Sequence, residues 1–237
     1  MQSQKESIAR VADYYAARAP EYHETTGYGV ERVDKGYAQL KELYQKAFRG
    51  HDVLEIACGT GYWTEAVAQV ARSVLATDIH PELVEMTRQR LISLDNVRCR
   101  VADAYSLETV TERFSAAFAQ YWWSHIPRAM RKPFLQTLHA KLLPGALVMF
   151  TDNIEYQGAS VKRRVDECGD IYEERLLRDG SRFETIKNFV NKSEFVDLLA
   201  GVVEDLEYIE HDTGNSAHEP SRLWTLSYRL KGSPPAA

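Results

Sequence analysis

The stretch VLEIACGTGYW at residues 53–63 constrains the fold of this chain more than any other. Its first four residues are mostly apolar and β-prone, the next five are small, and apolar residues then recur at helical spacing over about 62–72. This order predicts a strand, a tight glycine turn and a helix, the first unit of a nucleotide-binding sheet. Glycine suits such a turn because the backbone bends sharply and a ligand can approach without a Cβ in its way.

Two acidic residues narrow the class of ligand. Glu55 ends the predicted strand, where its carboxylate would repel a pyrophosphate at the helix N-terminus and attract an amino group. Thr64 stands where a dinucleotide fingerprint needs its third small residue. Asp78 follows the next predicted strand, a position suited to binding ribose hydroxyls. The pocket is therefore expected to accept a ribose and an ammonium group, and no diphosphate.

These motifs resemble those of the class I S-adenosylmethionine (SAM) dependent methyltransferases over roughly residues 50–152. Residues 55–61 are similar to the glycine motif of that family, with Ala57 in place of its first glycine. Asp78 and Ile79 resemble the ribose and adenine contact, and residues 102–104 resemble the motif at the adenine edge. The resemblance implies SAM as cofactor, S-adenosylhomocysteine (SAH) as product, and a cofactor site formed by Tyr14, Arg18, Glu55, Ala57, Cys58, Gly59, Gly61, Asp78, Ile79, Asp103, Ala104 and Gln120.

Composition indicates an ordinary globular protein and excludes several partners. The chain has 237 residues, is 44% hydrophobic and 27% charged, and carries a net charge of −5. This charge argues against a surface that binds nucleic acid. No apolar run approaches the ~18 residues of a membrane span, and the polar N-terminus does not resemble a signal peptide. We expect a cytoplasmic protein with no membrane partner. Its three cysteines are too widely spaced to indicate a disulfide framework or a zinc site.

The remaining pattern predicts an α/β fold with a doubly wound, seven-stranded, mainly parallel sheet. The expected helices are 3–18, 31–48, 62–72, 81–92, 107–112, 128–143 and 193–199, with the helix at 128–143 closed by Pro144 and Gly145. The expected strands are 53–56, 73–77, 96–101, 114–120, 146–151, 206–210 and 223–230. Seven strands with a late pair fit the Rossmann-like methyltransferase fold.

We expect one domain over residues 1–237, with a helical cap over about 1–48 and an inserted lid over about 154–190. A β-hairpin is predicted inside the insertion, with strands 171–177 and 182–186 around the Asp179-Gly180 turn. The tail from residue 231 is expected to be disordered.

The N-terminal segment is rich in aromatic residues, with Tyr14, Tyr15 and Tyr22 close together. Many small-molecule methyltransferases resemble this arrangement, in which such a segment lies over the cofactor. Packing of these tyrosines against the core is an equally open alternative. Arg18 suits bidentate pairing with the cofactor carboxylate, although an exposed arginine is the commoner case.

The acceptor is expected beyond the fourth strand, because ligands of open α/β sheets bind at the carboxyl ends of the strands. His125 lies there, and its ordinary pKa of ~6.5 suits a general base. An orienting or helix-capping role for this histidine stays open. Trp122 and Trp123 cannot both point into the core, so one is expected to flank the sulfonium or stack on a planar acceptor. The substrate-binding candidates are Tyr22, Tyr28, Trp122, Trp123 and Asn153.

Two further resemblances argue against a metal and against nucleic acid. Asp152 and Asn153 resemble the Asp-Asn pair of the metal-dependent catechol methyltransferases, which also need an aspartate near the end of the fourth strand. This chain has Gln120 there and no carboxylate up to His125, so we expect no catalytic metal. Residues 120–123 also lack the Asn/Asp-Pro-Pro-aromatic motif of amino-directed nucleic-acid methyltransferases.

The predicted function is SAM-dependent methyl transfer to an oxygen or nitrogen of a small-molecule metabolite. The sulfonium leaving group departs neutral, so positioning and desolvation can suffice unless the acceptor is a protonated hydroxyl. The alternatives are a carboxyl-directed methyltransferase, a non-catalytic SAM-binding protein and a dinucleotide oxidoreductase. Oligomeric state is left open, with a homodimer as one possibility.

Overall fold

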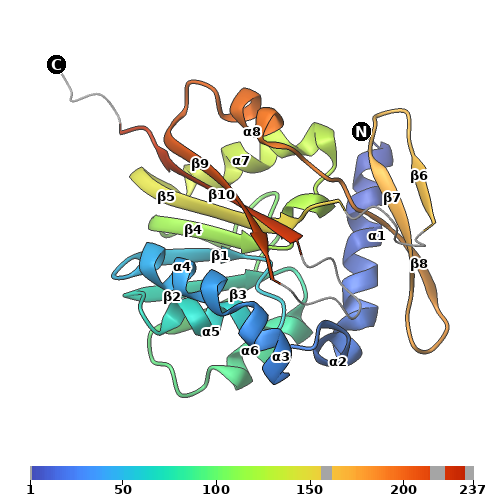
Figure 1. The fold of residues 1–237 in the computed structure, drawn as a ribbon, viewed down its shortest axis with the longest axis horizontal. Coiled ribbons are helices and arrows are strands. Elements are labelled where there is room, and N and C mark those ends of the chain that lie inside the picture. The colour runs from blue at the N-terminus through green and yellow to red at the C-terminus, as the bar shows by residue number, and fades with distance from the viewer. Residues whose placement is uncertain (1, 156–161, 214–221, 233–237) are drawn as a thin grey trace.

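The computed structural model describes residues 2–155, 162–213 and 222–232. Its main sheet has seven strands in the order β3-β2-β1-β4-β5-β10-β9. These strands are β1 (Asp52–Ile56), β2 (Ser73–Asp78), β3 (Val97–Val101), β4 (Phe114–Gln120), β5 (Leu142–Asn153), β9 (Val203–Asp212) and β10 (Arg222–Leu230). β10 runs antiparallel to both of its neighbours, β5 and β9, whereas the other described pairs of this sheet are parallel. The predicted mainly parallel, seven-stranded sheet is confirmed (Figure 1).

Side chains that alternate along the strands build a core on each face of the sheet. Val53 packs with Phe48 of α4 (Ala38–Phe48) and with α5 (Tyr62–Ala68). Its neighbour Leu54 belongs to the opposite cluster, which contains Phe134 of α7 (Arg131–Ala140) and Phe195 of α8 (Lys192–Leu199). A further helix, α6 (Pro81–Arg90), packs against β2 and β3. Helices on both faces make the sheet doubly wound, as expected.

Three local predictions were wrong. Residues 107–112 form turns in place of a helix, because Leu107 has a positive φ of 48° and Thr109 Oγ1 donates to the Val101 carbonyl. The expected helix 31–48 is divided into α3 (Glu31–Gly36) and α4. Pro144 and Gly145 lie within β5, and α7 ends at Ala140. The extra length of β5 is accommodated by a register shift against β4.

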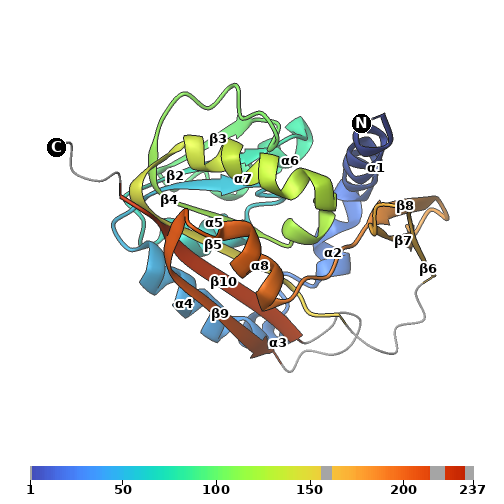
Figure 2. The ribbon, with the colours of Figure 1, turned by 90° about the horizontal axis from the view of Figure 1, so that it is seen from above.

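The N-terminal helix α1 (Gln2–Arg18) lies against a second, smaller sheet. After α1 come a 3₁₀ turn, η1 (Ala19–Glu21), and α2 (Tyr22–Thr26). The small sheet is antiparallel and contains β6 (Arg163–Val165), β7 (Ile171–Leu176) and β8 (Arg182–Ile186). Figures 1 and 2 both show α1 and the small sheet together at one side of the molecule. The predicted hairpin is confirmed, and β6 adds a short, exposed strand that its three residues did not predict.

Apolar and polar contacts join α1 to the small sheet. Val11, Tyr172 and Ile186 form a buried cluster of their own, and Ser7 Oγ lies 2.7 Å from Tyr172 Oη. Tyr14 packs edge-on against Phe183 of β8. The two segments are therefore joined to each other, although they are far apart in the sequence.

Backbone conformations reserved for small residues shape the turn between β1 and α5. Ala57, Gly59 and Gly61 have positive φ values of 54°, 57° and 79°. A Cβ on Gly61 would lie 2.9 Å from Thr87 Cγ2, whereas a Cβ on Gly59 would find Tyr22 Oη at 3.9 Å as its nearest atom. Cys58 N donates to the Thr77 carbonyl at 2.9 Å, which ties the turn to β2.

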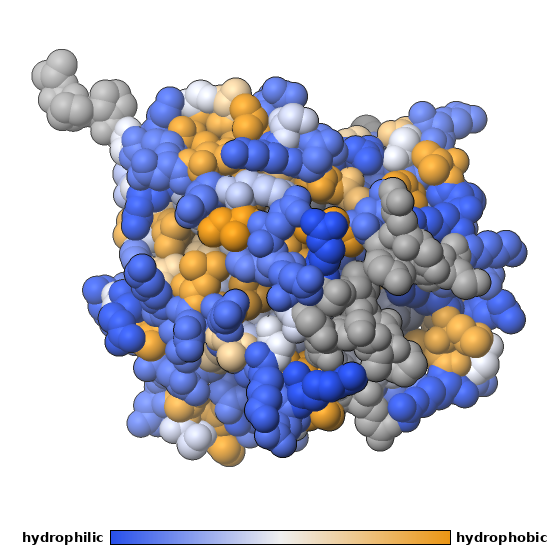
Figure 3. Space-filling view, viewed as in Figure 1, coloured by the Kyte–Doolittle hydropathy of each residue, from blue (hydrophilic) through white to orange (hydrophobic). Residues whose placement is uncertain are grey.

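The drawn face of the molecule shows apolar patches scattered among hydrophilic side chains, as is usual on surfaces in water (Figure 3). In the described part of the chain, every helix is too short or too polar to cross a bilayer. The tail that we predicted to be disordered begins at residue 231, and its residues from 233 onward lie outside the described part of the chain.

Gly61→Ala should lower the free energy of unfolding by about 2–4 kcal/mol, because it adds a clash with Thr87 to the ~1–2 kcal/mol strain of a left-handed alanine. Gly59→Ala is the matched control and should lose only the strain, about 1–2 kcal/mol. Urea unfolding without cofactor measures both. Equal losses would mean that Thr87 moves aside at no cost.

Candidate active site

Two adjoining cavities lie at the carboxyl ends of the parallel strands. The larger encloses about 750 Å³, part of it open to solvent, and α1 contributes Ile8, Val11, Ala12 and Tyr15 to its wall. Of the residues predicted from sequence, this cavity is lined by Tyr22, Ala57, Gly59, Asp78, Ile79, Asp103, Ala104, Gln120, Trp122 and His125. The smaller encloses about 290 Å³ and is lined by Tyr22, Tyr28, Glu55, Ala57, Cys58, Gly59 and Gln120 of the same set. Most of the predicted residues therefore meet in one place.

Glu55 is a buried carboxyl group in the wall of the smaller cavity. Its Oε2 accepts a hydrogen bond from Thr64 Oγ1 at 2.6 Å. Burial, with a smaller contribution from the charge of Asp78, raises the pKa of Glu55 to about 8. Within the described residues no cationic side chain forms an ion pair with it, so the site has room for a cation supplied by a ligand.

Asp78 is held at the wall of the larger cavity by backbone donors. Its Oδ2 accepts from Gly59 N and its Oδ1 from His80 N, both at 3.0 Å. Burial raises the pKa of this carboxyl above its ordinary value. Beside it, Ile79 keeps 43% of its surface exposed, which leaves an apolar face available to a flat ring. A ribose diol and an adenine match these two neighbours.

Gln120, at the end of β4, lies where the two cavities meet. Both its Nε2 and its Oε1 are buried and lack a hydrogen-bond partner among the described residues. An unsatisfied buried amide costs about 1–3 kcal/mol, so such groups are expected where a ligand completes the bonding. An ammonium site at Glu55, a diol site at Asp78 and a free amide between them fit SAM.

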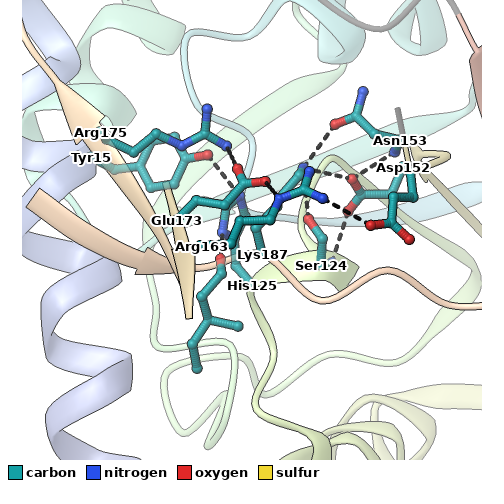
Figure 4. Close-up of polar contacts among 11 residues, drawn as sticks. Tyr15, Ser124, His125, Asp152, Asn153, Arg163, Glu173, Arg175 and Lys187 are labelled. Atoms are coloured by element: carbon teal, nitrogen blue, oxygen red, sulfur yellow. Dashed lines mark hydrogen bonds and ion pairs between the residues drawn. The ribbon is translucent and has the colours of Figure 1, made fainter. Parts of the chain in front are cut away.

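His125 is buried, and its surroundings determine its tautomer. Its Nδ1 lies 2.7 Å from the carbonyl oxygen of Ile186, which can only accept, so Nδ1 carries the proton. Its Nε2 then accepts from the Tyr15 hydroxyl at 2.8 Å. Burial and the charge of Lys187 lower the pKa of His125 to about 3, so the ring is neutral at neutral pH. Figure 4 shows Tyr15 and His125 together with Lys187.

Lys187, just after β8, ties the small sheet to the main sheet. Its Nζ donates to Ser124 Oγ at 2.9 Å, to Asn153 Oδ1 at 2.8 Å and to Asp152 Oδ1 at 3.1 Å (Figure 4). All four side chains are buried. The charge of Lys187 helps to hold the pKa of Asp152 below its ordinary value, although burial opposes this. Across the part of the chain that the structure describes, no three His, Cys, Asp or Glu side chains converge as a metal site.

Five of the predicted residues line neither cavity. Trp123 packs in the core between Phe134, Phe150 and Phe195, and the Asn153 amide is bonded to Lys187. The other three are Tyr14, Arg18 and Gly61.

Two of these three lie near the cavities without entering their walls. The Arg18 guanidinium donates to Thr25 Oγ1 and lies 5.0 Å from the centroid of the Tyr22 ring. Tyr14 packs against the Tyr15 ring. Both side chains therefore pack against residues that line the larger cavity.

Several site residues were missing from the predicted set. Tyr62 and Trp63 line the smaller cavity, and Tyr105 lines the larger one. All three come just after the glycine motif or the motif at residues 102–104, so their positions in the sequence could have indicated site residues. Tyr15 was recognised as aromatic, but nothing local indicated its bond to His125. Lys187 had no sequence signal, because its partners lie on β5 and on η2 (Trp123–His125).

Comparison with known proteins agrees with this chemistry. A protein-family model described as "Methyltransferase domain" matches residues 53–145. The ubiquinone biosynthesis O-methyltransferase of Xanthomonas campestris pv. campestris is 27% identical over 183 residues, which is 74% of this chain and 70% of that protein. The solved "DhpI-SAH complex structure" is 26% identical with a TM-score of 0.69, covering 95% of this chain and 97% of that one.

A more distant structure shares the fold. The N-methyltransferase NodS from Bradyrhizobium japonicum WM9 is 15% identical with a TM-score of 0.61, covering 85% of this chain and 98% of that one. The matched family region contains the glycine turn, Asp78 and Gln120, whose arrangement fits SAM. Residues 53–145 are therefore a methyltransferase domain, and the chain has the class I fold of SAM-dependent methyltransferases.

Proposed function

We propose that this enzyme methylates an oxygen atom of a small-molecule acceptor. The observation that carries the proposal is the fixed tautomer of His125, a residue of the larger cavity, which leaves Nε2 as a hydrogen-bond acceptor for a hydroxyl group. The likeness to the ubiquinone biosynthesis O-methyltransferase supports an oxygen acceptor. A second solved form of DhpI, described as a "DhpI-SAM-HEP complex", supports a cavity with room for an additional ligand next to SAM.

The cofactor is assigned to three groups of the chain. The Glu55 carboxylate binds the ammonium group, the Asp78 carboxylate binds the ribose diol, and the Gln120 amide bonds polar atoms between them. When bound, SAM supplies an electrophilic methyl group on a sulfonium. The role of the chain is then to hold the acceptor oxygen in line and to keep water away.

His125 takes up the acceptor proton. A hydroxyl acceptor replaces the Tyr15 phenol at Nε2, and its proton passes to Nε2 as the oxygen bonds to carbon. The Ile186 carbonyl keeps Nδ1–H in place throughout. The pKa of His125 is about 3, so its neutral ring is a weak base. Proton transfer therefore accompanies bond formation and does not precede it.

We assign the role of a lid to α1 and the small sheet. Four α1 side chains form part of the cavity wall, and one of them, Val11, also packs with Ile186 of the small sheet. Ligand exchange needs this wall to move, and closure excludes water from the sulfonium. Lys187 is the buried connection between the lid and the main sheet.

An oxyacid acceptor is the second candidate. Burial and then the charges of Lys187 and Arg175 lower the pKa of His125, but each cation is paired with a carboxylate, Lys187 with Asp152 and Arg175 with Glu173. A carboxylate acceptor would instead rely on its own charge, since it is already ionised and needs no base. The two candidates differ in their dependence on His125.

Asp78→Ala should weaken SAH binding by about 1.5–3 kcal/mol, the range for a hydrogen bond to a charged group. Calorimetry on the folded variant measures the loss. Asp95→Ala, which removes an exposed carboxylate away from the cavities, is the charge-matched control and should bind as tightly as wild type. Unchanged affinity in Asp78→Ala would remove the ribose assignment.

Affinity for SAH should rise between pH 6 and 7.5. The pKa of Glu55 in the folded protein is about 8, above the ordinary value for a glutamate side chain. Without ligand, Glu55 is therefore protonated between pH 6 and 7.5. An ammonium group favours the ionised form, so binding releases a proton and strengthens by roughly tenfold per pH unit. Calorimetry in buffers of different ionisation enthalpy counts this proton. Glu55→Gln should bind weakly and without the pH dependence; a variant that keeps the dependence would argue against the ammonium assignment.

His125→Gln should lower kcat by about 10²–10⁴-fold while SAH affinity stays near wild type. The acceptor is first identified by transfer of tritiated methyl groups to metabolite extracts. Wild-type kcat should show no inflection near pH 6.5, because the His125 pKa lies at about 3. A variant that retains full kcat excludes the base role and favours the oxyacid acceptor.

A further inference from the structure

A third cavity lies on the far side of Trp123 from the cofactor site. It encloses about 760 Å³, part of it open to solvent, between the start of α7 and α8. It shares no lining residue with the two cofactor cavities. The proposed mechanism does not use it, and none of the comparisons assigns it a role.

Arg131, at the start of α7, is a buried cation with unused donors in the wall of this cavity. Its side chain is only 6% exposed, and Nη1 donates to Glu194 Oε2 at 2.9 Å. Nε and Nη2 are buried without a partner among the described residues, and so is Nε1 of Trp123 in the same wall. Burial, and next the charge of Arg128, lower the pKa of Arg131. The three buried polar atoms that lack a partner in this wall are all donors.

The nearby carboxylates do not form hydrogen bonds with these unpaired donors. Glu194 Oε2 is shared, since Arg128 Nη1 also donates to it at 3.0 Å. Asp197 lines the cavity but is exposed, so water screens it. Asp170 Oδ1 accepts hydrogen bonds from Arg128 N and from Asn188 Nδ2, and Asp170 does not line the cavity. An acceptor-rich group inside the cavity would complete the bonding of Arg131.

The rest of the wall is apolar. Val190, Phe195 and Leu198 lie opposite or beside the guanidinium pair, together with the Trp123 ring. Unpaired buried donors next to an apolar wall, with the Glu194 and Asp197 carboxylates nearby, favour a ligand with two parts. We propose that this cavity is a second binding site, for a small molecule that joins an oxyanion to an apolar group. The oxyanion bonds Arg131 and Trp123 Nε1, and the apolar group contacts Phe195 and Leu198.

The site is close to the proposed base without being part of the methyl-transfer cavity. Trp123 and His125 belong to the same 3₁₀ turn, η2. The two sites therefore share one short segment of backbone but no lining residue. Because no lining residue is shared, we expect both ligands to bind at the same time.

Calorimetry on the full chain tests the proposal with three probes: hexanoate, hexan-1-ol and inorganic phosphate. Hexanoate should bind at least about tenfold more tightly than hexan-1-ol, which has the same chain without the charge, and more tightly than phosphate, which lacks the apolar part. Saturation with SAH should leave the hexanoate affinity unchanged. Equal affinity for hexanoate and hexan-1-ol, or loss of hexanoate binding with SAH, would overturn the assignment.

Two variants and one control, Lys132→Met, locate the binding site. Arg131→Met removes the donors at similar volume, and it should reduce hexanoate affinity to that of hexan-1-ol. Lys132→Met removes one positive charge from the exposed face of α7 and should bind hexanoate like wild type. Leu198→Trp fills the cavity while keeping Arg131, so it should abolish binding even if Arg131→Met does not fold. Wild-type hexanoate affinity in Leu198→Trp would overturn the proposal.

Discussion

The left-handed turn between β1 and α5 is the constraint on which the cofactor site depends. Positive φ values at Ala57, Gly59 and Gly61 bend the chain sharply between β1 and α5. The same turn gives Gly59 N to the Asp78 carboxylate and places Glu55 at the wall of the smaller cavity. Close contact between Gly61 and Thr87 fixes the turn against α6. The positions of Glu55 and Asp78, which we propose bind the ammonium group and the diol, thus follow from one backbone path.

The acceptor end depends on long-range contacts. His125 is held by Tyr15 from the N-terminal helix and by the Ile186 carbonyl from the small sheet, which are remote from it in sequence. Lys187 then joins the small sheet to β5 through a buried ion pair. Breaking such a pair would leave an uncompensated buried charge, so this connection is costly to open. Burial and the charge of Lys187 together keep the imidazole neutral.

Sequence predicted what local patterns encode. The glycine turn, the order of the strands and the positions of Asp78 and Gln120 followed from spacing and periodicity, and the structure places these residues together. The prediction failed where tertiary contacts decide: residues 107–112 formed turns, and Trp123 became a core residue. Lys187 and Arg131 could not be assigned from sequence, because their character comes from burial against partners that the fold supplies. The roles of the site residues remain predictions that the variants test.

The division of labour along the chain has an evolutionary consequence. The groups assigned to the cofactor come from one continuous region, from Glu55 to Gln120, whereas part of the wall of the larger cavity comes from α1, which lies outside it and packs on the small sheet. Mutations can therefore accumulate in the wall while the methyl donor is still recognised. Descendants of such a protein can acquire new acceptors by drift in two peripheral segments, and the chemistry of the donor is inherited unchanged.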